Sequence, residues 1–336
     1  MIQTRRAGAA PFRGVLAAVA VISLIAGCTG APETETAQAA SAAAGFPMEI
    51  SSCGHTSTLA AAPTRAVTLN QGATEVMLAL GLEESMAGTA HLDDAVAPQW
   101  KDAYDKVPIL AKEYPSREEL VAATPDFVYA TYARVFDDNV AGSQSALDDD
   151  SVASYLSPFG CADKSARPDA SFEAIWDEIE TVAEAFGVPD RAAEIKAEQK
   201  KTLESVKGSA QSLRVLWYDS GTKPPHVGAG NGAPQVIMDA IGAENIFADL
   251  DGGWSDGRWE DVLTADPDVI VLADASWDTA DDKKAYLEGD PVLSQLRAVK
   301  AGALVTVPFS QTTPGVRVVE GVVSVSEQIT AVSSDS

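Results

Sequence analysis

The chain has 336 residues, a length that accommodates about two domains, and its hydrophobic fraction of 46% is ordinary for a globular protein. Its 49 acidic residues outnumber its 24 Lys and Arg and give a formal net charge of −25, which argues against nucleic acid as a partner and against docking on anionic lipid through a basic patch. Three Cys and three His are too few for a zinc cluster, and we expect neither a metal site nor a cofactor.

The first residues predict an export signal. Three arginines lie within the first 13 residues, and the apolar run Val15–Ile22 that follows is too short for a comfortable transmembrane helix. The small residues before Cys28 resemble the lipobox of bacterial lipoproteins, which implies removal of residues 1–27 and lipid on the Cys28 thiol. Residues 28–45 show no apolar period and predict a flexible tether. We therefore expect a lipid-anchored protein on the extracytoplasmic face of the cell membrane, with an ordinary secretory signal as the alternative.

Two further cysteines remain if Cys28 carries lipid. They are Cys53 and Cys161, and a pair in an oxidising compartment predicts one disulfide, with two free thiols as the alternative. Closing a loop of about a hundred residues would stabilise the fold by about 4 kcal/mol in the chain-entropy model.

Strands and helices alternate from Phe46 onward. A β-rich run at 66–69 precedes a helical pattern at 72–81 that ends at glycine, and a helical pattern at 116–123 precedes a strand that starts near Pro125. Such alternation predicts an α/β fold with mostly parallel sheets.

A helical region divides the chain. Apolar residues recur at intervals of three and four over 172–186, after which Gly187 and Pro189 interrupt the pattern. A second helix, with Asp190 as its expected N-cap, extends to about residue 207 and has few apolar residues, so it can join two lobes while largely solvated.

The second half of the chain repeats features of the first. Glu118 precedes the Pro125-Asp126 pair by seven residues, and Glu260 precedes Pro267-Asp268 by the same distance, an offset of 142 for both features. Chance similarity between two helix–strand units is the alternative. We predict two Rossmann-like lobes joined by a single long interlobe helix, with the N-terminal lobe at 46–186, the linker helix at 187–212 and the C-terminal lobe at 213–336.

Five segments carry a resemblance to a known family. They are LNQGATEVMLALGL (69–82), SREELVAATPDFVYA (116–130), GAPQVIMDAIGAENIFAD (232–249), RWEDVLTADPDVIVL (258–272) and LRAVKAGALVTVP (296–308). In this order and spacing they resemble the substrate-binding proteins of ABC importers, in the class that binds ferric siderophores, cobalamin, haem and some metals. The resemblance implies a receptor, not an enzyme, and so no catalytic residues.

The resemblance also implies partners. Each lobe in this family presents one acidic residue to the permease, and the matching positions are Glu118 and Glu260. Carboxylates exposed in this way speed the association of a complex and fix its orientation more than they increase its affinity. We expect a monomer that docks on an ABC permease with its ATPase; ordinary first-turn helix acids are the alternative reading of both residues.

Loops after the predicted strands supply the candidate ligand-binding residues, because ligands bind beyond the carboxyl ends of strands in open α/β sheets. These candidates are Asn70, Gln71, His91, Tyr132, Arg134, Tyr218, His226, Trp254, Trp277 and Arg317. Aromatic walls suit a bulky organic ligand, and the acidic composition favours a neutral or cationic one, such as a ferric hydroxamate, over a triscatecholate complex. Haem, cobalamin or another organic solute, a non-transport ligand sensor and a secreted hydrolase are the alternatives; no G-x-S-x-G motif supports the hydrolase.

Overall fold

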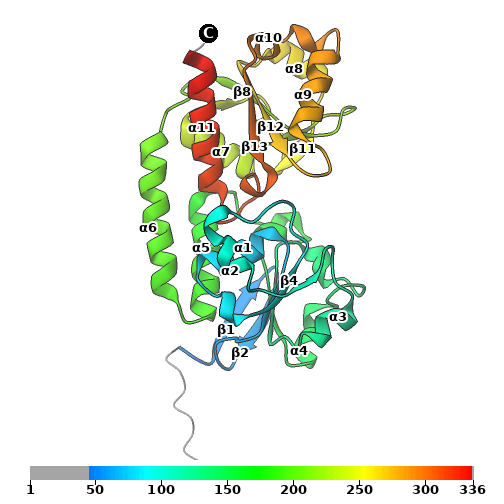
Figure 1. Ribbon diagram of the computed structural model, residues 1–336, viewed down its shortest axis with the longest axis vertical. Coiled ribbons are helices and arrows are strands. Elements are labelled where there is room, and N and C mark those ends of the chain that lie inside the picture. Colours follow the sequence, from blue (N-terminus) through cyan, green and yellow to red (C-terminus); the bar gives the residue numbers. More distant parts are fainter. Residues whose placement is uncertain (1–44, 335–336) are drawn as a thin grey trace, which may run out of the picture. The chain divides into compact units, whose positions relative to one another are not determined.

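Two separate main β-sheets organise residues 45–334, the part of the chain that this computed structural model describes (Figure 1). One sheet belongs to the first half of the chain and the other to the second half, which confirms the predicted α/β class. We call the elements around the first sheet the N-terminal lobe and those around the second sheet the C-terminal lobe. The predicted signal peptide, Cys28 and residues 28–44 of the predicted tether lie outside the described residues.

The N-terminal lobe is built on five parallel strands in the spatial order β5-β4-β3-β6-β7. These strands are β3 (Ala66–Leu69), β4 (Met86–Ala90), β5 (Ile109–Ala111), β6 (Phe127–Ala130) and β7 (Ala153–Leu156). Every residue of β3, β6 and β7 is buried, as expected for a parallel sheet covered on both faces. The lobe's helices are α1 (Gln71–Ala79), α2 (Lys101–Tyr104), α3 (Arg117–Ala122) and α4 (Gln144–Asp149).

An antiparallel hairpin precedes this sheet. Its strands, β1 (Met48–Ser52) and β2 (His55–Leu59), pack against β7. Cys53 lies in the turn of the hairpin and is bonded to Cys161, 108 residues away, which confirms the predicted disulfide.

The C-terminal lobe has a mixed six-stranded sheet in the order β11-β9-β8-β12-β13, with β10 paired to β8. Its strands are β8 (Arg214–Ser220), β9 (His226–Gly228), β10 (Glu244–Asn245), β11 (Trp254–Asp256), β12 (Val269–Asp274) and β13 (Leu304–Pro308). The pairs made by β8, β10, β12 and β13 with one another are parallel, whereas β9 and β11 form an antiparallel edge. The helices are α7 (Ala233–Ile241), α8 (Trp259–Ala265), α9 (Ala280–Gly289), α10 (Arg297–Ala301) and α11 (Val318–Ser334).

The internal repeat extends to individual hydrogen bonds. The Asp126 carboxylate, at the start of β6, accepts from the backbone N–H of Arg65 at 2.9 Å, and the Asp268 carboxylate, at the start of β12, accepts from the backbone N–H of Arg214 at 2.9 Å. The residue two positions before each aspartate, Thr124 or Asp266, has a positive φ, of 46° and 43° respectively. The 142-residue offset therefore marks the same helix-to-strand turn in both lobes.

One long helix, α6 (Pro189–Val206), connects the lobes, as the sequence predicts. It runs beside α5 (Phe172–Ala185), which buries an apolar stripe, and beside α11 (Figure 1). Only Ala192 and Ile195 of α6 are buried, as expected for a largely solvated connector. The expected N-cap at Asp190 was wrong: the N-cap is Val188, two residues earlier, because Pro189 occupies the first turn, where a missing N–H costs nothing, and Asp190 is a first-turn acid.

One cluster of buried apolar side chains runs through both lobes and the connector. It includes Met77 on α1, Ile195 on α6 and Ile237 on α7. A shared core opposes a wide hinge motion, because separating the lobes would expose part of that core to water. Within residues 45–334, no helix is both long enough and apolar enough to cross a bilayer.

Candidate ligand-binding cleft

A cavity of about 370 Å³ lies between the lobes. Segments that follow β6, β7 and β13, together with the end of β8, supply much of its lining, so it sits where the carboxyl ends of strands from both sheets meet. Its lining residues are Thr131, Tyr132, Phe159, Gly160, Lys164, Arg167, Pro168 and Ala170 from the first half of the chain, and Asp219, His226, Asn231, Gly232, Gly252, Gly253, Trp254, Phe309, Thr313 and Pro314 from the second. A volume of this size suits a small organic ligand.

Aromatic rings from both lobes face this cavity. Tyr132 and Phe159 contribute from the N-terminal lobe, and Trp254 and Phe309 from the C-terminal lobe. The ring of Trp277 meets Phe309 edge to face, with centroids 4.8 Å apart, although Trp277 itself is 57% exposed and does not line the cavity. The walls can therefore hold an apolar body between flat surfaces.

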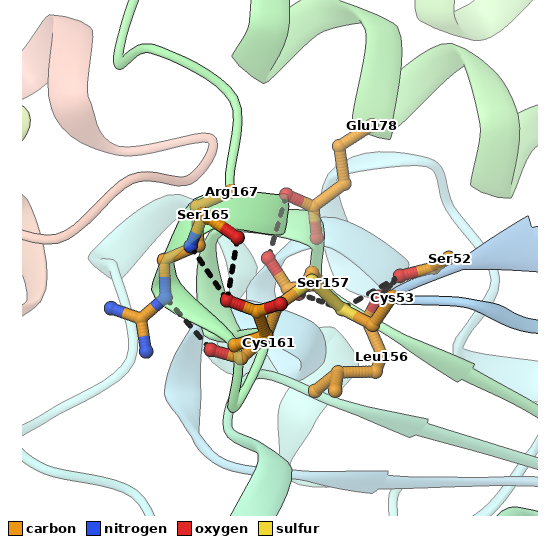
Figure 2. Close-up of a disulfide and its surroundings, with 9 residues drawn as sticks. Ser52, Cys53, Leu156, Ser157, Cys161, Ser165, Arg167 and Glu178 are labelled. Atoms are coloured by element: carbon orange, nitrogen blue, oxygen red, sulfur yellow. Dashed lines mark hydrogen bonds between the residues drawn. A yellow bond between two sulfur atoms is a disulfide. The ribbon is translucent and has the colours of Figure 1, made fainter.

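The loop after β7 brings positive charge to one wall. Lys164 and Arg167 lie on it, and the Arg167 Nε donates to the Cys161 carbonyl at 2.8 Å (Figure 2). The disulfide fastens this loop to the β1–β2 hairpin, and a bond between the Ser52 hydroxyl and the Leu156 carbonyl adds to that attachment. The disulfide thus helps to position two of the cavity's cationic side chains.

The same loop is held from its other side by a buried carboxylate. Glu178 on α5 accepts from the Ser157 hydroxyl at 3.0 Å and from the Tyr129 hydroxyl at 2.5 Å. Burial raises the pKa of Glu178 to about 7. At Gly160 a Cβ would lie 1.8 Å from the Thr131 carbonyl oxygen, so only glycine lets these two lining segments touch.

The opposite wall carries the remaining charged groups. His226 Nδ1 lies 3.1 Å from an Asp256 carboxylate oxygen, a pair formed across β9 and β11. Asp219, at the end of β8, accepts from the Ser220 hydroxyl at 3.1 Å through one oxygen, and burial raises the pKa of its carboxyl. The lining is thus far more balanced in charge than the chain as a whole.

Of the sequence-predicted ligand residues, Tyr132, His226 and Trp254 line the cavity. Asn70, His91 and Arg134 belong to a neighbouring cluster at the ends of β3, β4 and β6, centred on Tyr114. There His91 stacks on the Tyr114 ring with centroids 4.1 Å apart, Arg134 lies over that ring, and the Asn70 amide donates to its hydroxyl at 2.8 Å. Burial lowers the pKa of His91. None of these four residues lines the cavity.

Two further candidates are buried in structural roles. The Gln71 side-chain oxygen accepts from the backbone N–H groups of Asp93 and Asp94, both at 2.9 Å, and so shapes the loop after β4. Tyr218 is 1% exposed, and its hydroxyl donates to the Gly221 carbonyl at 2.6 Å.

Arg317 joins the two lobes. Its guanidinium is buried and reaches three acidic side chains, with Nη1 at 3.3 Å from Glu75 and 3.7 Å from Asp94, and Nε at 2.8 Å from Glu320. Glu75 and Asp94 belong to the N-terminal lobe. We call Arg317, Glu75, Asp94 and Glu320 the interlobe ion cluster. Burial raises the pKa of Glu75 to about 7, although the charge of Arg317 opposes that rise.

The proposed docking acids occupy equivalent surface positions. Glu118 and Glu260 lie in the first turns of α3 and α8, and both side chains are exposed. Ser116 caps α3 by accepting from the Glu119 N–H. The repeat therefore places one exposed carboxylate on each lobe.

Sequence reasoning missed the loop after β7, and with it Phe159, Lys164 and Arg167. Its signal was the apolar run 152–156 followed by the turn-forming Ser157-Pro158, which marks a further strand and a further loop at the same sheet edge.

In the described part of the chain, no group of three or more His, Cys, Asp or Glu side chains could hold a metal ion.

Two α/β lobes that enclose an aromatic cavity and are joined by a helical connector define a solute-binding protein. The chain belongs to the periplasmic binding protein family, whose match covers residues 67–310, and this confirms the resemblance seen in the sequence. It is 23% identical over 325 residues to an ABC transporter substrate-binding lipoprotein of Bacillus subtilis, YvrC, covering 94% of this chain and 96% of that one.

Solved structures show the same fold. A periplasmic binding protein from Veillonella parvula has 30% identity and a TM-score of 0.75, with 84% of this chain and 97% of that one covered. A protein described as an ABC-type Fe3+-hydroxamate transport system, from Saccharomonospora viridis, has 23% identity and a TM-score of 0.70, with 84% and 99% covered.

Proposed function

We propose that this periplasmic binding protein captures an iron–siderophore-type complex in the cavity between its lobes and delivers it to an ABC permease. The observation that carries the proposal is the placement of four aromatic side chains around a cavity that both lobes line. Rings of this kind hold the organic shell of a chelated metal, while a few polar groups fix its orientation. The similarity to the Saccharomonospora viridis protein supports the same ligand class.

The net charge of the chain, rather than the charge of the lining, favours a neutral or cationic complex. The chain carries a net charge of −25, whereas the lining has Lys164 and Arg167 on one wall and Asp219 on the other. The negative potential of the acidic chain would repel a triscatecholate complex, which carries several negative charges, but it would not repel a ferric trihydroxamate.

The delivery step rests on the two exposed acids. Glu118 and Glu260 of a monomeric receptor are proposed to dock on two related permease subunits, and lipid on Cys28 would keep the receptor close to its transporter. The lipoprotein description of the Bacillus subtilis relative supports this anchor. We keep residues 46–186, 187–212 and 213–336 as the proposed lobe and linker boundaries.

A second candidate ligand class follows from His226. Its imidazole lines the cavity, and an imidazole is a ligand for haem iron. A vitamin B12-binding protein of Vibrio parahaemolyticus, 23% identical over 211 residues, adds cobalamin to the compounds that deserve testing.

Isothermal titration of the mature protein with ferrioxamine B, a ferric triscatecholate, haem and cobalamin tests these assignments. We expect micromolar or tighter binding of the hydroxamate complex and weaker binding of the others. Phe309→Ala should weaken that binding about tenfold or more, and Trp100→Ala, outside the cavity, should leave it within about twofold. Tight binding of haem or cobalamin alone would replace the siderophore assignment, and binding of none of the four would refute it.

A further inference from the structure

Two polar atoms of the cavity walls are buried without a hydrogen-bond partner among the described residues. One is Oδ1 of Asp219, an acceptor, and the other is Nε1 of Trp254, a donor. Both residues line the cavity and both come from the C-terminal lobe. Buried polar groups are nearly always paired in folded proteins, because an unpaired one costs the free energy of its lost hydration.

The backbone at Asp219 is built to present this side chain. Tyr218 pairs with Val227, and Ser220 pairs with His226, so β8 has one extra residue between two consecutive partners on β9. That extra residue is Asp219. A bulge of this kind interrupts the alternation of a strand and redirects one side chain, and bulges are common beside binding sites.

The surroundings of Asp219 leave its charge incompletely balanced. Its second oxygen accepts from the Ser220 hydroxyl at 3.1 Å. His226 and Lys283 lie nearby, but the His226 Nδ1 pairs with Asp256 at 3.1 Å, and Lys283 donates to the carbonyl of Ala273 at 2.7 Å and pairs with Asp278 at 3.5 Å. A group that enters the cavity with an N–H donor would therefore complete the coordination of Asp219.

We infer that Asp219 and Trp254 form a recognition pair, in which Asp219 accepts an N–H, most strongly an ammonium, from the ligand and the Trp254 indole donates to a ligand oxygen. The ligand class is an organic chelate with an amine or amide N–H beside its carbonyl or hydroxamate oxygens. This inference rests on the proposed function, since it describes how the same cavity selects among such chelates.

The pair also predicts a stability effect that is independent of any ligand. Asp219→Asn keeps the shape of the side chain and removes a partly desolvated charge, so the ligand-free variant should melt at the same temperature as the wild type or above it. Trp254→Phe keeps an aromatic wall and removes the unpaired indole N–H together with the ring that carries it, at a residue that is only partly buried. Neither variant is therefore expected to fail through misfolding.

Isothermal titration with two probes tests the pair: ferrioxamine B, which carries a free ammonium, and its N-acetylated form, which does not. We expect Asp219→Asn to weaken ferrioxamine B about tenfold or more and the acetylated probe by roughly threefold, and Trp254→Phe to weaken both roughly fivefold. Asp239→Asn is the matched control, because Asp239 is an exposed aspartate of the same lobe that accepts from the Gln235 amide at 2.7 Å and does not line the cavity, and it should change neither affinity beyond about twofold.

Each outcome has a distinct meaning. If the wild type binds ferrioxamine B and Asp219→Asn binds each probe with the same affinity as the wild type does, the recognition pair is refuted and the proposed function stands. An unchanged affinity in Trp254→Phe removes the indole from the pair. If the wild type binds neither probe, the proposed function fails, and the inference that rests on it fails as well.

Discussion

The lobes of this protein contact each other through two very different polar regions. In the interlobe ion cluster, the buried guanidinium of Arg317 contacts Glu75, Asp94 and Glu320 and also donates to the Ser310 hydroxyl oxygen at 2.6 Å. In the cavity, by contrast, Asp219 retains a buried oxygen without a partner. Satisfied charges hold the lobes together, whereas unsatisfied groups mark the place where a ligand completes the interface.

This contrast also bears on motion. The ion cluster, the shared apolar core and the solvated helix α6 all resist a large change in the angle between the lobes. We therefore expect ligand capture with modest closure, in which the side chains around the cavity adjust more than the lobes move.

Removing Arg317 should have the largest effect on stability. Arg317→Met leaves the buried Glu75 without its cationic partner and should lower the free energy of unfolding by about 3–5 kcal/mol, measured by urea denaturation at pH 8. The control is Arg258→Gln, which breaks an exposed pair with Asp261 and should cost about 1 kcal/mol or less. A loss below about 1 kcal/mol for Arg317→Met would show that the cluster does not hold the lobes together.

Loss of the disulfide should have the next largest effect. The double variant Cys53→Ser/Cys161→Ser opens a loop spanning 108 residues and should lower stability by about 4 kcal/mol. Because the bond fastens the loop that carries Lys164 and Arg167, affinity for the hydroxamate probe should also fall. Unchanged affinity in the double variant would mean that the loop is positioned by Glu178 and the strands alone.

Glu178 should make stability depend on pH. Its folded pKa of about 7 lies above the ordinary 4.5, so the native state binds the extra proton between these values. The contribution of Glu178 to the free energy of unfolding should therefore be greatest below about pH 4.5. It should fall by on the order of 3 kcal/mol as the pH rises from there through 7. Glu178→Gln should flatten this part of the profile, and an equally steep profile in the variant would assign the titration to another group, Glu75 being the first to test.

The docking acids should have the smallest effect on the isolated protein. Glu118→Lys and Glu260→Lys alter exposed first-turn residues, so stability should change by about 0.5 kcal/mol or less and ligand affinity should be unchanged. Stimulation of the transporter ATPase in proteoliposomes should nevertheless fall sharply, most of all in the double variant. Full stimulation by the double variant would place the permease contact elsewhere.

The fold could be read from the sequence because it depends on local signals. The β-rich run at 66–69 became β3, and Gly81, which ends the helical pattern at 72–81, has a left-handed conformation just after α1. The boundary at Asp190 was missed because a proline in the first turn competes with a capping side chain as the start signal.

The site was only partly predictable. Tyr132 was found because it follows β6, and the segment after a strand faces the cleft. His226 and Trp254 also line the cavity, but they were expected on loops and instead lie on the antiparallel strands β9 and β11 at one edge of the sheet. Arg317 was predicted to meet a ligand, but its partner Glu75 lies 242 residues away in sequence, and no local pattern signals that pairing. The bulge that singles out Asp219 depends on the register between β8 and β9, which one sequence does not specify.

Anomalous diffraction at the iron edge, from crystals grown with ferrioxamine B, tests the central claim most directly. The account predicts one iron peak within the cavity bounded by Tyr132, Trp254 and Phe309, with the Arg317–Glu75 contact intact in the same crystal. An iron peak outside that cavity, or a bound state in which Arg317 and Glu75 have separated, would contradict it.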